Sequence, residues 1–130
     1  MLKTIPLLVI LLSVCSVCEM DKWSALSMIE TGDRDCCVGK AGEISRWQIK
    51  RSVWHSNTSL PFSAATSQIQ AKTVAERVQG VRIAHFKAVH HREPTNVEFY
   101  LLWNCPAHVL KPSAAELERA QRFANLCERK

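Results

Sequence analysis

The chain has 130 residues and a formal net charge of +5, with 47% hydrophobic and 22% charged residues. This length predicts a single domain. The basic residues are spread along the sequence and form no basic stripe, so the composition argues against nucleic-acid binding. The mild positive excess instead suits an anionic partner such as a cell-wall polymer.

The first 18 residues have the pattern of an export signal. Lys3 supplies a positive charge, residues 5–14 are an almost unbroken apolar run, and a possible cleavage site follows up to Cys18. The run is too short to span a bilayer comfortably, so we expect a cleaved signal peptide and no stable membrane span. Residues 19–130 would then be the mature domain, periplasmic or secreted by a bacterium.

Four cysteines remain in the mature part of the sequence: Cys36, Cys37, Cys105 and Cys127. Because export permits oxidation and a small core benefits from a cross-link, we expect Cys36 or Cys37 to be bridged to Cys105 or Cys127. A buried free thiol at either of the last two is the alternative. No Cys-x-x-Cys pair remains in the mature part of the sequence, so we expect neither a metal site nor a cofactor.

The first half of the mature sequence predicts one helix and an irregular loop. Asp21 is a candidate N-cap, an apolar stripe follows it at helical spacing, and Gly32 is a candidate helix end. Glycine and aspartate between residues 33 and 42 predict a loop. Residues 42–54 fit either a short strand or a helical turn.

The second half predicts three further helices. A long one should span residues 63–91, and capping boxes at Thr95–Glu98 and Ser113–Glu116 should begin the other two. The sequence therefore predicts a mainly α fold. The residues expected on the buried sides of the long and last helices are Ile69, Val74, Val78, Val81, His85, Val89, Leu117, Ala120, Ala124 and Cys127.

Glu30 is the residue whose position suggests chemistry. It lies at the apolar end of the first helix, two residues before the glycine. The negative end of the helix dipole and partial burial both favour a protonated carboxyl group. Cleavage of a glycosidic bond needs such an acid, because the leaving sugar oxygen must receive a proton.

Three motifs in order resemble those of lytic transglycosylases and goose-type lysozymes. Residues 25–32 (ALSMIETG) resemble the helix end that carries the catalytic glutamate in these families. Residues 39–49 (GKAGEISRWQI) resemble their glycine-rich second motif, and residues 102–106 (LWNCP) with Val109 resemble their third, Ala-Tyr-Asn-Ala-Gly. The resemblance implies a lysozyme-like helical domain with a catalytic cleft.

The resemblance also implies roles for individual residues. Glu30 would be the acid, Gln48 a polar group on the cleft floor, and Asn104 a ligand of the sugar or of Glu30. Ser45 would bond to Glu30 or to an acetamido group, or else cap a turn, and Trp103 would form a wall of the sugar site. Two further tryptophans, Trp47 and Trp54, would stack on sugars or belong to the core.

Glu43 is the candidate second carboxylate. In a hydrolase it would activate water or stabilise positive charge at the anomeric carbon, whereas a transglycosylase resembles a one-glutamate enzyme. The alternative is a solvated loop residue or an ion-pair partner of Arg46. Asp33 and Asp35 are further candidates, better explained as turn residues.

The sequence therefore predicts an exported enzyme that cleaves β-1,4 bonds between the aminosugars of peptidoglycan, with Glu30 as general acid and base. We expect a lytic transglycosylase acting as a monomer. A hydrolytic lysozyme that uses Glu43 is the first alternative. The second is a wall-binding or inhibitory module with the same fold and no turnover, which the altered second motif favours.

Overall fold

The computed structural model describes residues 20–128, and the expected signal peptide lies outside them. The described chain is mainly helical. Between residues 20 and 128 there is no β-strand, and the only strand-like feature is an antiparallel bridge between Ile44 and Ile49. The mainly α prediction is confirmed.

The first helix, α1, spans Lys22–Thr31 and has the ends that the sequence predicts. The Asp21 carboxylate accepts hydrogen bonds from the backbone N–H groups of Trp23 and Ser24, at 3.0 and 3.1 Å. At the other end Gly32 adopts a left-handed conformation with φ of 62°, which glycine reaches at little cost. This turn brings the chain out of the helix directly after Glu30.

Residues 33–50 form an irregular loop that leads into α2, Arg51–Asn57. The segment that the sequence left ambiguous therefore contains both a bridge and a helix. Arg46 holds the loop together: its Nε and Nη2 donate to Asp35 at 2.7 and 3.0 Å, and its Nη1 lies 3.9 Å from Asp33. Arg46 thus pairs with the two aspartates and not with Glu43.

The long helix α3 spans Gln68–His90 and follows a 3-10 helix, η1, at Phe62–Thr66. It begins later than predicted, and only two of the six residues predicted on its buried side are buried. Val74 and Val78 are buried, whereas Ile69, Val81 and Val89 are 78%, 67% and 56% exposed, and His85 is exposed. The buried face includes two alanines, which allow neighbouring elements to approach closely. Its members are Ala71, Val74, Ala75, Val78, Gln79 and Phe86.

Helices α4, Asn96–Asn104, and α5, Ala114–Cys127, begin at the two predicted capping boxes. In each, the N-cap hydroxyl accepts from the N3 backbone and the N3 glutamate accepts from the N-cap backbone. Leu117 is 46% exposed, against expectation, while Ala120, Ala124 and Cys127 are buried. A second 3-10 helix, η2, occupies Pro106–His108.

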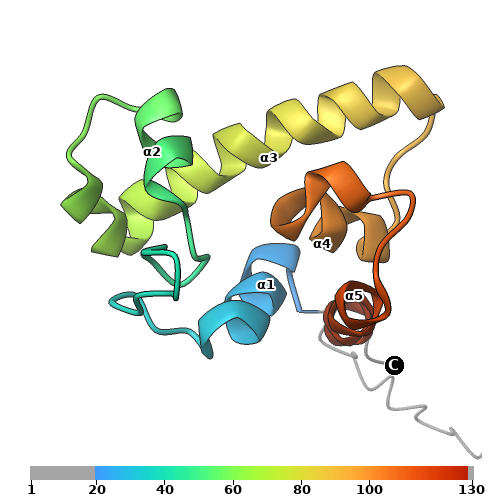
Figure 1. The fold of residues 1–130 in the computed structure, drawn as a ribbon, viewed down its shortest axis with the longest axis horizontal. Helices are drawn as coiled ribbons and strands as arrows, with labels where there is room; N and C mark the ends of the chain where they lie inside the picture. The colour runs from blue at the N-terminus through green and yellow to red at the C-terminus, as the bar shows by residue number, and fades with distance from the viewer. Residues whose placement is uncertain (1–19, 129–130) are drawn as a thin grey trace, which may run out of the picture.

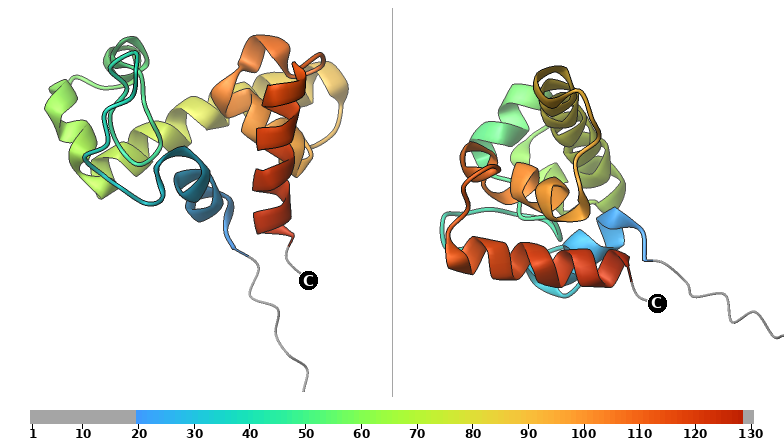
Figure 2. Two further views of the ribbon diagram at one scale, coloured as in Figure 1. Left: turned by 60° about the horizontal axis from the view of Figure 1, so that its bottom comes forward. Right: turned by 90° about the vertical axis from the view of Figure 1, so that its right-hand side faces the viewer.

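Figure 1 shows α3 crossing the molecule, with α2 and η1 toward one end and α4 beside the other. In the left view of Figure 2, α1 lies between the loop region and α5. Aromatic rings join these parts: Trp23 of α1 makes edge-to-face contacts with Trp47, Phe99 and Trp103, with ring centroids 5.7–6.0 Å apart. The loop, α1 and α4 therefore share one core.

Trp47 and Trp54 are core residues. Their exposed fractions are 2% and 0%, and their indole N–H groups donate to the carbonyls of Trp23 and Leu60 at 2.9 Å. Neither side chain is available to stack on a sugar.

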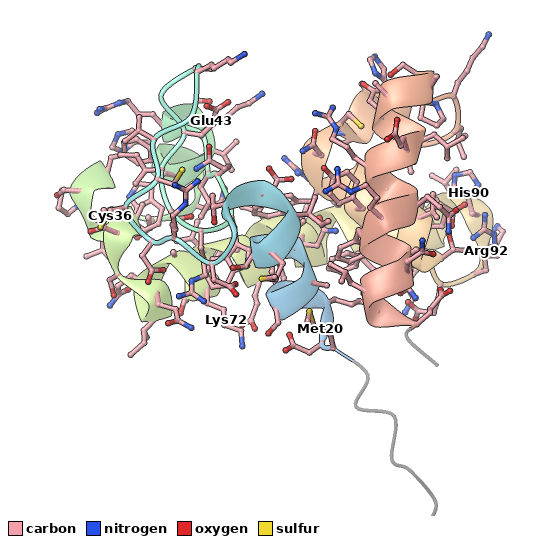
Figure 3. The ribbon with its side chains drawn as sticks, turned by 90° about the horizontal axis from the view of Figure 1, so that it is seen from below. Met20, Cys36, Glu43, Lys72, His90 and Arg92 are labelled. Atoms are coloured by element: carbon pink, nitrogen blue, oxygen red, sulfur yellow. The ribbon has the colours of Figure 1, made fainter. Side chains whose placement is uncertain are left out.

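The expected disulfide is not formed. Cys36 and Cys37 carry free thiols. Figure 3 places Cys36 in the loop region, across α1 from α5, which carries Cys127. The prediction was wrong because it rested on the oxidising compartment and on the number of cysteines. Neither determines whether two cysteines lie close enough in space to be bridged.

No helix in residues 20–128 is long and apolar enough to cross a membrane. Within the same residues, no group of three or more histidine, cysteine, aspartate or glutamate side chains is arranged to hold a metal ion.

Candidate active site

Glu30 lies in the last turn of α1 and contacts the end of α4. Its Oε1 accepts a hydrogen bond of 2.9 Å from Nδ2 of Asn104, the last residue of α4. The two residues are 74 positions apart in the sequence. The left-handed turn at Gly32 ends α1 just beyond Glu30, and the break before Pro106 ends α4 at Asn104, so two helix ends bring this pair together.

Tyr100 completes the surroundings of Glu30. It lies one helical turn before Asn104, is 1% exposed, and its hydroxyl accepts a second hydrogen bond of 3.3 Å from Asn104 Nδ2. Burial raises the pKa of the Tyr100 hydroxyl, and the negative charge of Glu30 raises it further. Tyr100 therefore stays protonated near neutral pH and is available as a hydrogen-bond donor to the Glu30 carboxylate.

The pKa of Glu30 is raised above its ordinary value of 4.5. Burial is the main cause, since a desolvated carboxylate loses the stabilisation that water provides. Hydrogen bonds from Asn104 and Tyr100, and the positive charge of Arg119, lower the pKa but do not cancel this effect. The charge of Glu43 raises it slightly more. Glu30 is thus a half-buried carboxyl group that holds its proton to higher pH than a glutamate in water.

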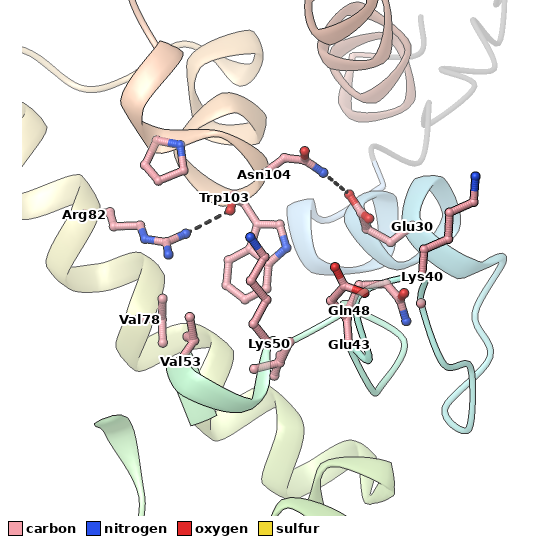
Figure 4. Close-up of a pocket in the computed structure, with 13 residues that line it drawn as sticks. Glu30, Lys40, Glu43, Gln48, Lys50, Val53, Val78, Arg82, Trp103 and Asn104 are labelled. Atoms are coloured by element: carbon pink, nitrogen blue, oxygen red, sulfur yellow. Dashed lines mark hydrogen bonds between the residues drawn. The ribbon is translucent and has the colours of Figure 1, made fainter. Parts of the chain in front are cut away.

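Glu30 faces a cleft of about 390 Å³ between the loop, α2, α3 and the end of α4 (Figure 4). Of the six predicted site residues, five line it: Glu30, Glu43, Gln48, Trp103 and Asn104. Ser45 does not. The other lining residues are Gly39, Lys40, Ile49, Lys50, Val53, Val78, Arg82 and Pro106.

Ser45 has a local structural role. Its side chain is fully buried, and its Oγ accepts a hydrogen bond of 3.1 Å from the backbone N–H of Trp47. Its φ of 83° puts it in a left-handed turn. Ser45 therefore caps the turn between the bridged residues Ile44 and Ile49. Of the two roles expected for Ser45, the structure supports the cap of a turn, since the hydroxyl is fully buried and does not line the cleft.

Gln48 lines the cleft while its amide group holds the loop. Its Nε2 donates to the carbonyls of Cys37 and Ser45, both at 3.0 Å, which leaves Oε1 without a protein partner among the described residues. Gly39 packs so closely that a Cβ atom there would collide with Oε1 of Gln48 and with the carboxylate of Glu43. The absence of a side chain at Gly39 therefore makes room for both polar groups at the cleft surface.

Glu43 and Trp103 complete the predicted set. Glu43 is half-buried, and its Oε2 accepts a hydrogen bond of 3.0 Å from the backbone N–H of Ala41. The indole N–H of Trp103 donates to the carbonyl of Trp47 at 3.1 Å. This hydrogen bond to the buried part of the loop fixes the orientation of Trp103, whose side chain forms part of the cleft wall.

Sequence reasoning missed four residues of the site: Tyr100, Lys40, Lys50 and Arg82. Tyr100 could have been found, because helical spacing places it on the same side of α4 as Asn104. Arg82 could not, since it lies in the middle of α3 and reaches the cleft only through the packing of α3 against α4.

We expect Asn104→Ala to raise the pKa of Glu30 further. The Asn104 hydrogen bond favours the charged carboxylate, so its removal favours the protonated form. Titration of the Glu30 side-chain carboxyl by ¹³C NMR should give a midpoint above 4.5 in the wild type and a higher one in Asn104→Ala. The exposed Asn125→Ala serves as control and should leave the midpoint unchanged. A lower midpoint in Asn104→Ala would contradict this assignment.

Comparison of the chain with protein-family models, with characterised proteins and with solved structures gives no match.

Proposed function

We propose that this chain is an exported enzyme with a lysozyme-like fold that cleaves β-1,4 glycosidic bonds between the aminosugars of peptidoglycan. The observation that carries the proposal is Glu30, a carboxyl group of raised pKa that faces the cleft and is held by Asn104. This arrangement suits general acid catalysis, which requires a proton donor that is still protonated at the working pH. The three-motif resemblance supports the same residue.

We assign the reaction to lytic transglycosylation. Protonated Glu30 gives its proton to the bridging oxygen while the bond from that oxygen to the anomeric carbon breaks. The resulting Glu30 carboxylate then accepts the proton of the sugar's own C6 hydroxyl as its oxygen bonds to the anomeric carbon and closes a 1,6-anhydro ring. The proton returns to Glu30, and no water is consumed. Tyr100 and Asn104 are suited to stabilise the carboxylate between the two steps.

The hydrolytic alternative has one observation in its favour: Glu43 lines the same cleft as Glu30 and makes no ion pair with residues 20–128. A carboxylate placed there can activate water or stabilise a cationic transition state. Two observations favour the one-glutamate reaction. The charge of Glu43 is only the smallest of the causes acting on the Glu30 pKa, and its Oε2 is engaged by the backbone of its own loop.

Glu43→Gln separates the two reactions. We expect cleavage products with 1,6-anhydro ends and a rate close to that of the wild type, because water activation is not needed. A hydrolase would give reducing ends and lose roughly 10²-fold in rate with this substitution. Mass spectrometry of the released muropeptides distinguishes the products, since an anhydro end has one water fewer than a reducing end. Exclusively reducing ends would overturn the transglycosylase assignment and make Glu43 catalytic.

The alternative to an enzyme is a wall-binding or inhibitory module that has the same fold and no catalytic turnover. It predicts that the protein binds purified cell wall and releases no soluble fragments. A zymogram on purified peptidoglycan with Glu30→Gln as control tests this rival, because an enzyme gives a clearing zone that the variant lacks.

A further inference from the structure

Three cations line the cleft beside its two carboxyl groups: Lys40, Lys50 and Arg82. None of the three forms an ion pair with any residue between 20 and 128. The proposed cleavage uses none of them. Positive charge that the protein leaves uncompensated in a cleft attracts anionic groups of a ligand.

Arg82 is held in place by the fold. The side chain is half-buried, and Nη1 donates to the carbonyls of Leu102 and Trp103, at 2.9 and 2.8 Å. The guanidinium carbon also lies 5.8 Å from the centre of the Trp103 ring. Its Nε and Nη2 make no hydrogen bond to the described residues. An oriented guanidinium with unused N–H donors is suited to binding a carboxylate, which accepts two parallel hydrogen bonds.

Arg82 also lies where the cleft continues into other hollows. A second hollow of about 310 Å³ shares Val53, Val78 and Arg82 with the cleft and extends over Val81. A third, of about 440 Å³ between α3 and α4, also includes Arg82. A substituent that leaves the main cleft in these directions therefore passes the guanidinium.

Arg82 and the catalytic group lie on opposite sides of Trp103. Figure 4 shows Arg82 on one side of Trp103 and Glu30 on the other, with the long Lys50 side chain between them. Lys50 is exposed, and its side chain makes no hydrogen bond with the described residues. The acid and Arg82 therefore face different parts of one bound ligand, and Lys50 lies between these parts.

We propose that Arg82 and Lys50 form a carboxylate-binding subsite, which selects glycan strands bearing anionic substituents over neutral aminosugar polymers. This inference rests on the proposed function. In peptidoglycan the carboxylates belong to the peptide branches, or to the lactyl groups of strands from which the peptides have been removed. A polymer of N-acetylglucosamine alone carries neither.

Binding measurements test the subsite without turnover. The protein would carry Glu30→Gln, and isothermal titration calorimetry would compare three oligosaccharides of equal length: one with peptides, one stripped to its lactyl groups, and one of N-acetylglucosamine only. We expect Lys50→Gln to weaken binding of carboxylate-bearing oligosaccharides about fivefold, the effect of losing one exposed charge pair, and to leave the neutral one unchanged. Arg82→Gln should weaken the same ligands more strongly.

Lys111→Gln is the matched control, because it removes the same charge from an exposed position outside the cleft and should change nothing. Since the Lys50 side chain makes no internal bond, Lys50→Gln remains informative even if Arg82→Gln unfolds the protein. Weakening with the peptide-bearing ligand alone assigns the subsite to peptide carboxylates, and weakening with both charged ligands extends it to the lactyl group.

Two results overturn the subsite while leaving the proposed function intact: equal affinity of the parent protein for neutral and charged oligosaccharides, or no selective effect of Lys50→Gln. Absence of binding to all three oligosaccharides overturns the proposed function and the subsite together.

Discussion

Glu30→Gln is expected to remove about 10²-fold or more of the glycan-cleaving rate, equivalent to ~3 kcal/mol of transition-state stabilisation, while the protein remains folded. The amide has nearly the shape of the carboxyl group and still faces Asn104, but it cannot give a proton to the leaving oxygen. The other carboxyl group that lines the cleft, Glu43, accepts a hydrogen bond from the backbone of its own loop, so we expect no substitute acid among the described residues.

Glu30→Gln should lower activity but raise the stability of the folded protein at pH 7. The folded-state pKa of Glu30 lies above its unfolded value near 4.5, so the folded protein holds this proton to higher pH. The contribution of Glu30 to stability is therefore largest below pH 4.5 and is lost as pH rises through the folded-state pKa. We expect Glu30→Gln to unfold at a higher denaturant concentration than the wild type at pH 7, with the difference shrinking as the solution is acidified.

Glu118→Gln is the matched control for both measurements, since Glu118 is exposed on α5 and lies outside the cleft. Because its side chain is exposed, this substitution should change neither the activity nor the stability at pH 7. Near-normal cleavage by Glu30→Gln would contradict its role as the acid. A variant that is less stable than the wild type at pH 7 would contradict the account of its burial.

Trp54→Ala is expected to lower the free energy of unfolding by about 3–5 kcal/mol. The Trp54 side chain is completely buried, contacts the Phe62 ring with centroids 6.2 Å apart, and donates its indole N–H to the Leu60 carbonyl. Truncation leaves a cavity between α2 and η1 and removes that hydrogen bond. Urea denaturation monitored by circular dichroism measures the loss.

Ile69→Ala provides the contrast to Trp54→Ala. The sequence pattern places Ile69 on the buried side of α3, yet its side chain is 78% exposed, so its truncation should change stability by no more than about 0.5 kcal/mol. A loss above 2 kcal/mol for Ile69→Ala would mean that α3 is rotated from the orientation described. A loss below 1 kcal/mol for Trp54→Ala would argue against its place in the core.

Helix ends were predictable because their signals are local. The side chains of Asp21, Thr95 and Ser113 each accept a hydrogen bond from a backbone N–H group no more than three residues away. The contact that begins each helix is therefore contained in a short segment of sequence. Gly32 ends α1 for the same kind of reason, since it adopts a conformation that glycine reaches easily. These features need no knowledge of the tertiary fold.

The buried side of α3 was less predictable because apolar residues occur on more than one of its sides. Val74 and Val78 face the core with the small residues Ala71 and Ala75, whereas Val81 and Val89 face outward. The positions of the large apolar residues therefore favour a face of α3 that is exposed in the structure. Ala71 and Ala75 are buried because α3 packs closely against its neighbours. The sequence alone does not reveal this packing.

Residues of the candidate site also differ in how far the sequence could predict them. The resemblance placed Glu30 and Asn104 in one site, and the fold places them in hydrogen-bond contact. It also placed Ser45 there, but a one-dimensional motif does not distinguish a side chain in the cleft from one buried beneath it. Arg82 belongs to no motif, and its position depends on the contact of α3 with the carbonyl end of α4.

The most direct test of the central claim is mass spectrometry of the soluble fragments released from purified peptidoglycan by the wild-type protein and by Glu30→Gln. We predict muropeptides with 1,6-anhydro ends from the wild type and almost none from the variant. Release of equal amounts by the two proteins, or no release by the wild type, would contradict glycan cleavage by Glu30.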